Sequence, residues 1–104
     1  MAVTVEQINE TTFKVTVEQR TTTMHTVTVR PEYWQKLTGS RVGAETLVEK
    51  SFQFLLEREP NTSILRAFDL AVIQRYFPDY EKTIRTMFEE AATEKAGEGA
   101  PEIA

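Results

Sequence analysis

The spacing of the apolar residues changes at Arg30-Pro31, and this change constrains the fold more than any other feature of the sequence. Before it, valine and phenylalanine recur at every second position, with polar residues between them. Such alternation is typical of strands that have one buried face and one hydrated face. We therefore predict an antiparallel meander with strands over about residues 2–7, 12–19 and 24–30.

After Arg30 the apolar spacing becomes helical. Proline is tolerated in the first turn of a helix, where its missing N–H is not needed, so a short helix is expected to begin at Pro31. A longer helix is expected from about Ala44, because apolar residues then recur at intervals of three and four. Pro60 disfavours helical backbone at the residue before it, so this helix should end at Arg58 or Glu59.

The segment after Pro60 is expected to form a turn and then further helix. The sequence "NTS" at 61–63 supplies side chains that can start a turn, and Asp69 is predicted to cap a helix over 70–77. A last helix is expected to follow Pro78, because an acidic first turn suits the positive end of a helix. Three residues are expected to return the chain to the core between these elements: Ile64, Leu65 and Phe68.

Strands that precede helices in this way favour an α+β fold, with the helices on one face of the sheet. We predict an antiparallel meander of two or three strands packed against three to four helices. A chain of 104 residues is long enough for one core, so residues 1–92 are expected to form a single domain. Residues 89–104 hold five acids and one lysine, whereas residues 1–88 hold eleven acids and eleven bases. We expect residues 93–104 to be a disordered acidic tail.

The composition excludes several classes of protein. There is no cysteine, so disulfides, thiol nucleophiles and thiolate zinc sites are excluded. The N-terminus does not resemble a signal peptide, and no apolar run approaches the ~18 residues of a membrane span. We therefore expect a cytoplasmic protein without membrane contact. The neutral balance of residues 1–88 gives no electrostatic footprint for nucleic acid.

No catalytic set is visible in the sequence. His25 is the only histidine, and because it alternates in step with Val27 and Val29 it is expected to be structural. It has no second histidine or cysteine with which to bind a metal, and no serine lies in a G-x-S-x-G turn. We predict no enzymatic activity, no catalytic, cofactor-binding or metal-binding residues, and a role as an interaction module.

A candidate interaction surface surrounds the sequence "EREPN" at 57–61. The helix dipole disfavours acids at a helix C-terminus, so Glu57 and Glu59 are expected to pair with Arg58 or Arg66. Phe54 is out of step with the main apolar stripe of its helix. Either this helix is wrapped on two sides, or Phe54 faces a partner subunit in a homodimer or another protein. Tyr33 is also expected to be exposed. The candidate interaction surface therefore consists of Tyr33, Phe54, Glu57, Arg58, Glu59 and Arg66.

A strand followed by two helices over residues 24–59 also has the order of a ribbon-helix-helix DNA-binding unit. In that alternative, Thr26, Thr28 and Arg30 would read the major groove. Three features oppose it: the preceding strands would occupy the edge that the dimer needs, only one of the three readers is basic, and residues 1–88 carry no net charge. A nucleic-acid partner is therefore not expected.

The segment "LVEKSFQFLLEREPNTSILRAFDLAVIQRYFPDYE" at 47–81, preceded by "HTVTV" and "EYWQKLTG", carries a more specific likeness. It resembles a family of small bacterial proteins that has no assigned activity. The resemblance implies a self-contained domain and supplies no catalytic or binding residue.

Overall fold

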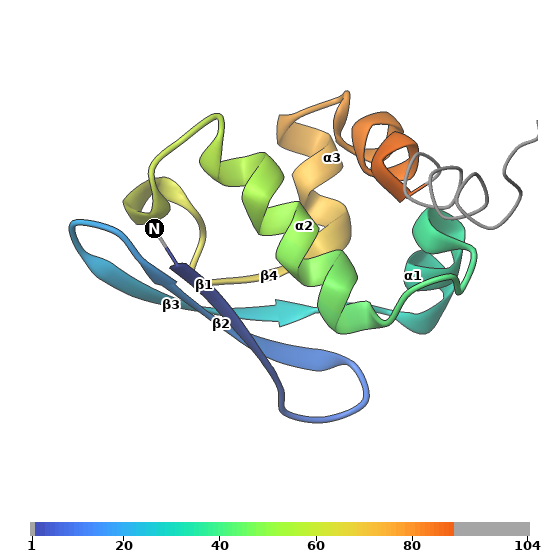
Figure 1. Ribbon diagram of the computed structural model, residues 1–104, viewed down its shortest axis with the longest axis horizontal. Coiled ribbons are helices and arrows are strands. Elements are labelled where there is room, and N and C mark those ends of the chain that lie inside the picture. The colour runs from blue at the N-terminus through green and yellow to red at the C-terminus, as the bar shows by residue number, and fades with distance from the viewer. Residues whose placement is uncertain (1, 89–104) are drawn as a thin grey trace, which may run out of the picture.

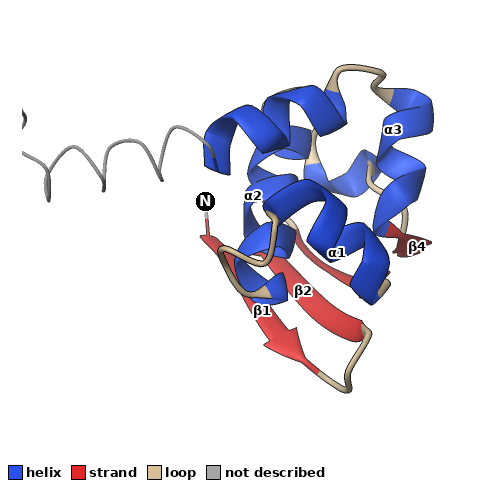
Figure 2. Cartoon of the chain, turned by 90° about the vertical axis from the view of Figure 1, so that its right-hand side faces the viewer, coloured by secondary structure: helices blue, strands red, loops and turns tan. Residues whose placement is uncertain are grey.

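The computed structural model describes residues 2–88 of the chain. The strands form one four-stranded sheet in the order β1-β2-β3-β4. Figure 1 shows helices lying over this sheet, and Figure 2 shows that the helices gather on one side of the strands. The tail predicted over 93–104 lies outside the described residues. In chain order the elements are β1 (Ala2–Gln7), β2 (Thr12–Glu18), β3 (Thr22–Thr28), α1 (Pro31–Thr38), α2 (Ala44–Leu56), the 3₁₀ turn η1 (Asn61–Ser63), β4 (Ala67–Asp69), the 3₁₀ turn η2 (Leu70–Val72), α3 (Ile73–Tyr76) and a last helix over residues 80–88.

The predicted meander is confirmed. Strands β1, β2 and β3 pair antiparallel in order, with Val5 opposite Val15 and Val15 opposite His25. The third strand starts and ends two residues earlier than predicted. On β2 the alternating residues Phe13, Val15 and Val17 are fully buried, so the face predicted to be apolar is the one that the helices cover.

The prediction of a purely antiparallel sheet is wrong, because a fourth strand pairs parallel to β3. The helices α1 and α2 lie between β3 and β4 in the chain, so the helices are interspersed with the strands. A parallel pair needs a long crossover of this kind. The pairing begins where the Thr26 N–H donates to the Arg66 carbonyl at 2.7 Å. The strand β4 has only three residues, too few to show an alternating pattern in the sequence.

The helices α1 and α2 begin at Pro31 and Ala44, as predicted. Gly39 ends α1 with φ of 63°, a left-handed conformation that glycine adopts without strain. Regular α2 ends at Leu56, two to three residues before the predicted end at Arg58 or Glu59. The chain makes one further turn, because the Glu59 N–H still donates to the Leu55 carbonyl at 2.9 Å.

After Pro60 the chain follows the predicted order with two corrections. Asp69 is a cap as predicted, since its Oδ1 accepts from the Ala71 N–H at 2.9 Å, but it caps the turn η2 that precedes the short helix α3. Ile64 is buried and Phe68 is half-buried, whereas Leu65 is 49% exposed. The prediction that Leu65 lies in the core is therefore wrong.

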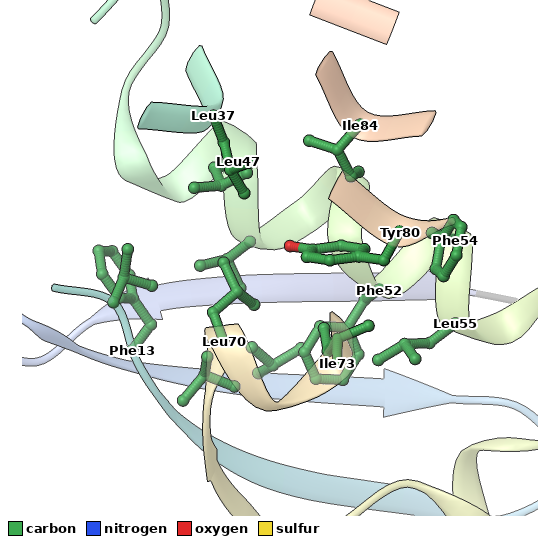
Figure 3. Close-up of a cluster of buried hydrophobic side chains, with 14 of the residues drawn as sticks. Phe13, Leu37, Leu47, Phe52, Phe54, Leu55, Leu70, Ile73, Tyr80 and Ile84 are labelled. Atoms are coloured by element: carbon green, nitrogen blue, oxygen red, sulfur yellow. The ribbon is translucent and has the colours of Figure 1, made fainter. Parts of the chain in front are cut away.

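The helix α2 is covered on two sides, which settles the alternative left open for Phe54. One side faces the sheet, and the last helix packs against the other. Figure 3 shows Tyr80 of the last helix beside Phe54. The centroids of the two rings are 5.3 Å apart. The Ser51 hydroxyl donates to the Leu47 carbonyl and accepts from the Tyr80 hydroxyl at 2.6 Å. Burial raises the pKa of the Tyr80 phenol well above its ordinary value.

Candidate functional site

A groove of about 330 Å³ lies between the C-terminal end of α2 and the segment from η1 to α3. This volume is at the lower end of the range of ~300–1,000 Å³ for small-ligand pockets, so the groove suits one or two side chains. We call it the α2–α3 groove. The residues that line it are Leu55, Glu59, Ser63, Ile64, Leu65, Phe68, Val72, Ile73, Tyr76 and Phe77.

The α2–α3 groove carries exposed apolar surface. Large apolar side chains are markedly exposed at four positions within residues 2–88, and two of them, Leu65 and Tyr76, line this groove. The other two stand singly: Ile8 lies in the first turn and Met24 lies on the sheet. Single exposed apolar residues are normal, but two around one hollow mark a surface that can exclude water when a partner fills it.

Glu59 is the carboxylate of the α2–α3 groove. Within residues 2–88 its side chain has no hydrogen-bond or ion-pair partner, and no lysine or arginine lines the groove. The groove therefore combines apolar walls with one half-buried negative charge that the described part of the chain leaves unpaired.

Arg58 occupies the corner beside the groove and is held there by four contacts. Its Nη1 donates to the Phe54 carbonyl at 3.0 Å, and its Nη2 lies 3.2 Å from Asp79 Oδ2. Its guanidinium lies over the Phe54 ring, 3.6 Å from the centroid. A second ion contact, to Glu57 Oε1, measures 3.5 Å. These bonds join the end of α2 to the start of the last helix.

Two residues of the predicted interaction surface are buried. Phe54 is 0% exposed, so the hypothesis that it faces a partner subunit is wrong. Tyr33 is 8% exposed, so its predicted exposure is wrong as well. Its hydroxyl donates to Glu81 Oε2 at 2.8 Å, and Lys36 Nζ lies 3.2 Å from Oε1 of the same carboxylate. Burial, together with this hydrogen bond, raises the pKa of the Tyr33 phenol well above its ordinary value.

The charged residues of the predicted surface do not form one site. Glu57 pairs with Arg58, one of the two partners expected for it. Glu59 pairs with neither Arg58 nor Arg66, and within residues 2–88 Arg66 has no ion-pair partner. Of the six predicted residues, the structure places Glu59 alone in the α2–α3 groove.

The strand proposed to read DNA lies inside the sheet. Over Thr26 and Thr28, β3 pairs with β2 on one edge and β4 on the other. A ribbon-helix-helix dimer needs this strand to be free to pair with its copy. Arg30, the basic reader, lies 3.0 Å from Asp69 Oδ2. The topology therefore opposes the ribbon-helix-helix alternative.

His25 is 1% exposed and belongs to a hydrogen-bonded network under the connection that follows η1. Its Nδ1 lies 2.7 Å from the Leu65 carbonyl, which can only accept, so Nδ1 carries the proton. Its Nε2 then accepts from the Thr23 hydroxyl at 2.8 Å. That hydroxyl accepts in turn from Asn61 Nδ2 at 3.1 Å, and the same amide nitrogen donates to the Thr21 carbonyl at 2.7 Å. The imidazole faces Phe52 at 5.4 Å between centroids and lines none of the described hollows.

Two kinds of feature, metal-ligand clusters and membrane-spanning helices, are absent from the described part of the chain. Over residues 2–88, no three side chains of His, Asp or Glu come together as ligands for a metal ion. None of the helices within the same range is both long enough and apolar enough to cross a bilayer.

Sequence reasoning missed the residues that give the groove its apolar rim. Tyr76 is 66% exposed, and Leu65 follows the buried Ile64 directly. One signal was present: adjacent apolar residues in a short connection cannot both point inward in extended backbone.

Comparison with protein-family models, with curated proteins and with solved structures finds no match to this chain. The resemblance of residues 47–81 to a family of small bacterial proteins stays a prediction.

Proposed function

We propose that this protein is a non-enzymatic, cytoplasmic interaction module that binds a segment of a partner protein in the α2–α3 groove. The observation that carries the proposal is the exposure of Leu65 and Tyr76 on the rim of an apolar groove. A bulky apolar side chain of the partner would cover both residues. Small hollows that receive one bulky side chain of the partner usually lie at the centre of a protein–protein interface.

Binding is favoured over catalysis by the burial of His25, the single histidine, and of Ser51. Both ring nitrogens of His25 are hydrogen-bonded inside the core. The Ser51 hydroxyl is fully buried between Leu47 and Tyr80. A general base must reach the proton that it abstracts, and neither of these groups lines a hollow that a substrate could enter.

Leu65→Ser and Tyr76→Ser should abolish binding of peptides selected on the wild-type protein and change the free energy of unfolding by less than about 1 kcal/mol. Both side chains are half-exposed or more, so little apolar area is lost from the folded state. The measurement is selection of random displayed peptides on the immobilised protein, followed by amide NMR titration of the enriched peptides.

The matched controls are Ile8→Ser and Met24→Ser, which remove equally exposed apolar side chains outside the groove. These variants should bind the selected peptides as the wild type does. Peptides that bind all four variants alike, or that shift only amide signals far from the α2–α3 groove, would contradict the proposal.

Self-association is a second candidate role, and the open edge of β1 favours it. The Ile8 N–H donates to the opposite Thr12 carbonyl at 2.8 Å, so even-numbered residues of β1 direct their backbone groups toward β2. The backbone N–H and C=O groups of the odd-numbered residues therefore point away from the sheet, at Val3, Val5 and Gln7. An antiparallel copy of β1 could pair with these groups, and a register that places Val3 opposite Val5 brings no like charges together.

Val5→Pro should convert a β1-paired dimer to a monomer and leave the β1–β2 ladder intact. The N–H that it removes faces outward, and proline is tolerated on an edge strand in that position. Light scattering after size exclusion measures the change in mass. Thr4→Pro is the contrast, because the N–H that it removes faces β2 and its loss should destabilise the fold. A wild-type protein that stays monomeric at millimolar concentration would exclude this role.

A further inference from the structure

We infer that the partner segment carries a lysine or arginine next to the apolar side chain that fills the α2–α3 groove. The inference rests on the proposed function and specifies its ligand. In this inference, the Glu59 carboxylate binds the cation of the partner's lysine or arginine. The apolar and aromatic walls of the groove contact the aliphatic stem of that residue and the apolar side chain next to it.

The charge of the groove is the first support. Glu59 is half-buried, and within residues 2–88 its carboxylate has no partner. An apolar ligand that covered the groove would remove water from this carboxylate and leave a charge uncompensated, which opposes binding. A ligand with a cation at that end supplies the missing partner. A ligand that carries a carboxylate at that end is disfavoured, because it would place a second negative charge beside Glu59.

The cations nearest in sequence do not fill this role. Arg58 is adjacent to Glu59 in the chain, but its guanidinium is engaged by Asp79, Glu57 and the Phe54 carbonyl. Its position over the Phe54 ring adds a further contact that holds it away from the groove. The cation that complements Glu59 is therefore expected to come from the partner.

The aromatic content of the lining is the second support. Phe68, Tyr76 and Phe77 line the same groove as Glu59. Aromatic faces attract ammonium and guanidinium groups, and the methylene stems of lysine and arginine pack well on apolar walls. A purely apolar side chain would contact only the walls of the groove. A lysine or arginine next to that side chain would contact the walls and also pair with the Glu59 carboxylate.

Two capped dipeptides test the inference: acetyl-Leu-Lys-amide and acetyl-Leu-norleucine-amide, which have the same side-chain stem with and without the charge. In amide NMR titrations of the full chain, the lysine peptide is expected to bind about fivefold more tightly, the preference that an ion pair at a partly exposed site supplies. In Glu59→Gln, the two peptides should bind with equal affinity. The matched control is Glu57→Gln, because Glu57 is exposed, pairs with Arg58 and does not line the groove.

The outcomes separate the two proposals. If both peptides shift the groove signals with equal affinity in the wild type, the cation preference is overturned and apolar binding stands. If Glu59→Gln keeps the full preference for lysine, the assignment of Glu59 is overturned. If neither peptide shifts any groove signal, the apolar binding itself is contradicted. Thermal unfolding of each variant establishes that the folds are equivalent.

Discussion

Phe54→Ala is expected to lower the free energy of unfolding by about 3–5 kcal/mol, as removal of a fully buried phenylalanine does. The Phe54 ring is 0% exposed and meets Phe77 at 5.9 Å and Tyr80 at 5.3 Å between centroids. It also supports the Arg58 guanidinium. Small domains are stable by only about 5–15 kcal/mol, so this loss is a large part of the total.

Urea unfolding followed by circular dichroism and by fluorescence of Trp34, the single tryptophan, measures the loss. Phe54→Leu is the milder comparison, because it keeps most of the apolar volume, and it should cost about half as much or less. If Phe54 instead formed a surface for a partner, Phe54→Ala would leave the unfolding midpoint of the isolated chain unchanged. That result would contradict the buried position.

Asn61→Ala is expected to lower the free energy of unfolding by about 3 kcal/mol, because it leaves several buried acceptors without donors. Asn61 is 3% exposed, and its Nδ2 donates to the Thr21 carbonyl and the Thr23 hydroxyl, with the Val17 carbonyl at 3.4 Å. The Thr23 hydroxyl also orients the His25 ring. The loss therefore extends along the network to the Leu65 carbonyl.

Asn61→Asp distinguishes loss of the donor from loss of volume. The carboxylate has nearly the size of the amide but presents an acceptor to two carbonyl oxygens, so it should destabilise at least as much at neutral pH. Thr62→Ala is the matched control, since Thr62 is adjacent and exposed, and it should change the stability by less than about 0.5 kcal/mol. Equal stability of Asn61→Ala and the wild type in urea would show that the network contributes nothing.

The parts of the fold that local pattern determines were predictable from the sequence. Alternation placed β1 and β2 to within one residue, and Pro31 marked the start of α1. The strand β4 was not predictable, because its three residues have no pattern of their own and become a strand only beside β3. Its existence depends on a tertiary contact, and such contacts override local propensity.

The candidate site was predictable only in part. The sequence directed attention to the end of α2, and Glu59 does line the groove there. Periodicity along one helix cannot show whether a second element covers its other side, so both alternatives stayed open for Phe54, and it was included in the candidate surface although the last helix buries it. The exposure of Leu65 and Tyr76 depends on how η1, β4 and α3 turn relative to α2, which no local rule specifies.

The β3–β4 pairing also has a consequence for the order in which the chain folds. The meander β1–β2–β3 joins neighbouring segments through short turns, so its contacts close quickly. The hydrogen bond from His25 to Leu65 joins residues forty positions apart, and β4 can dock only after α1 and α2 have crossed the sheet. The meander is thus the expected early nucleus, and the groove, with walls drawn from the end of that crossover and from the segment β4 to α3 that follows it, is completed among the last features of the native state.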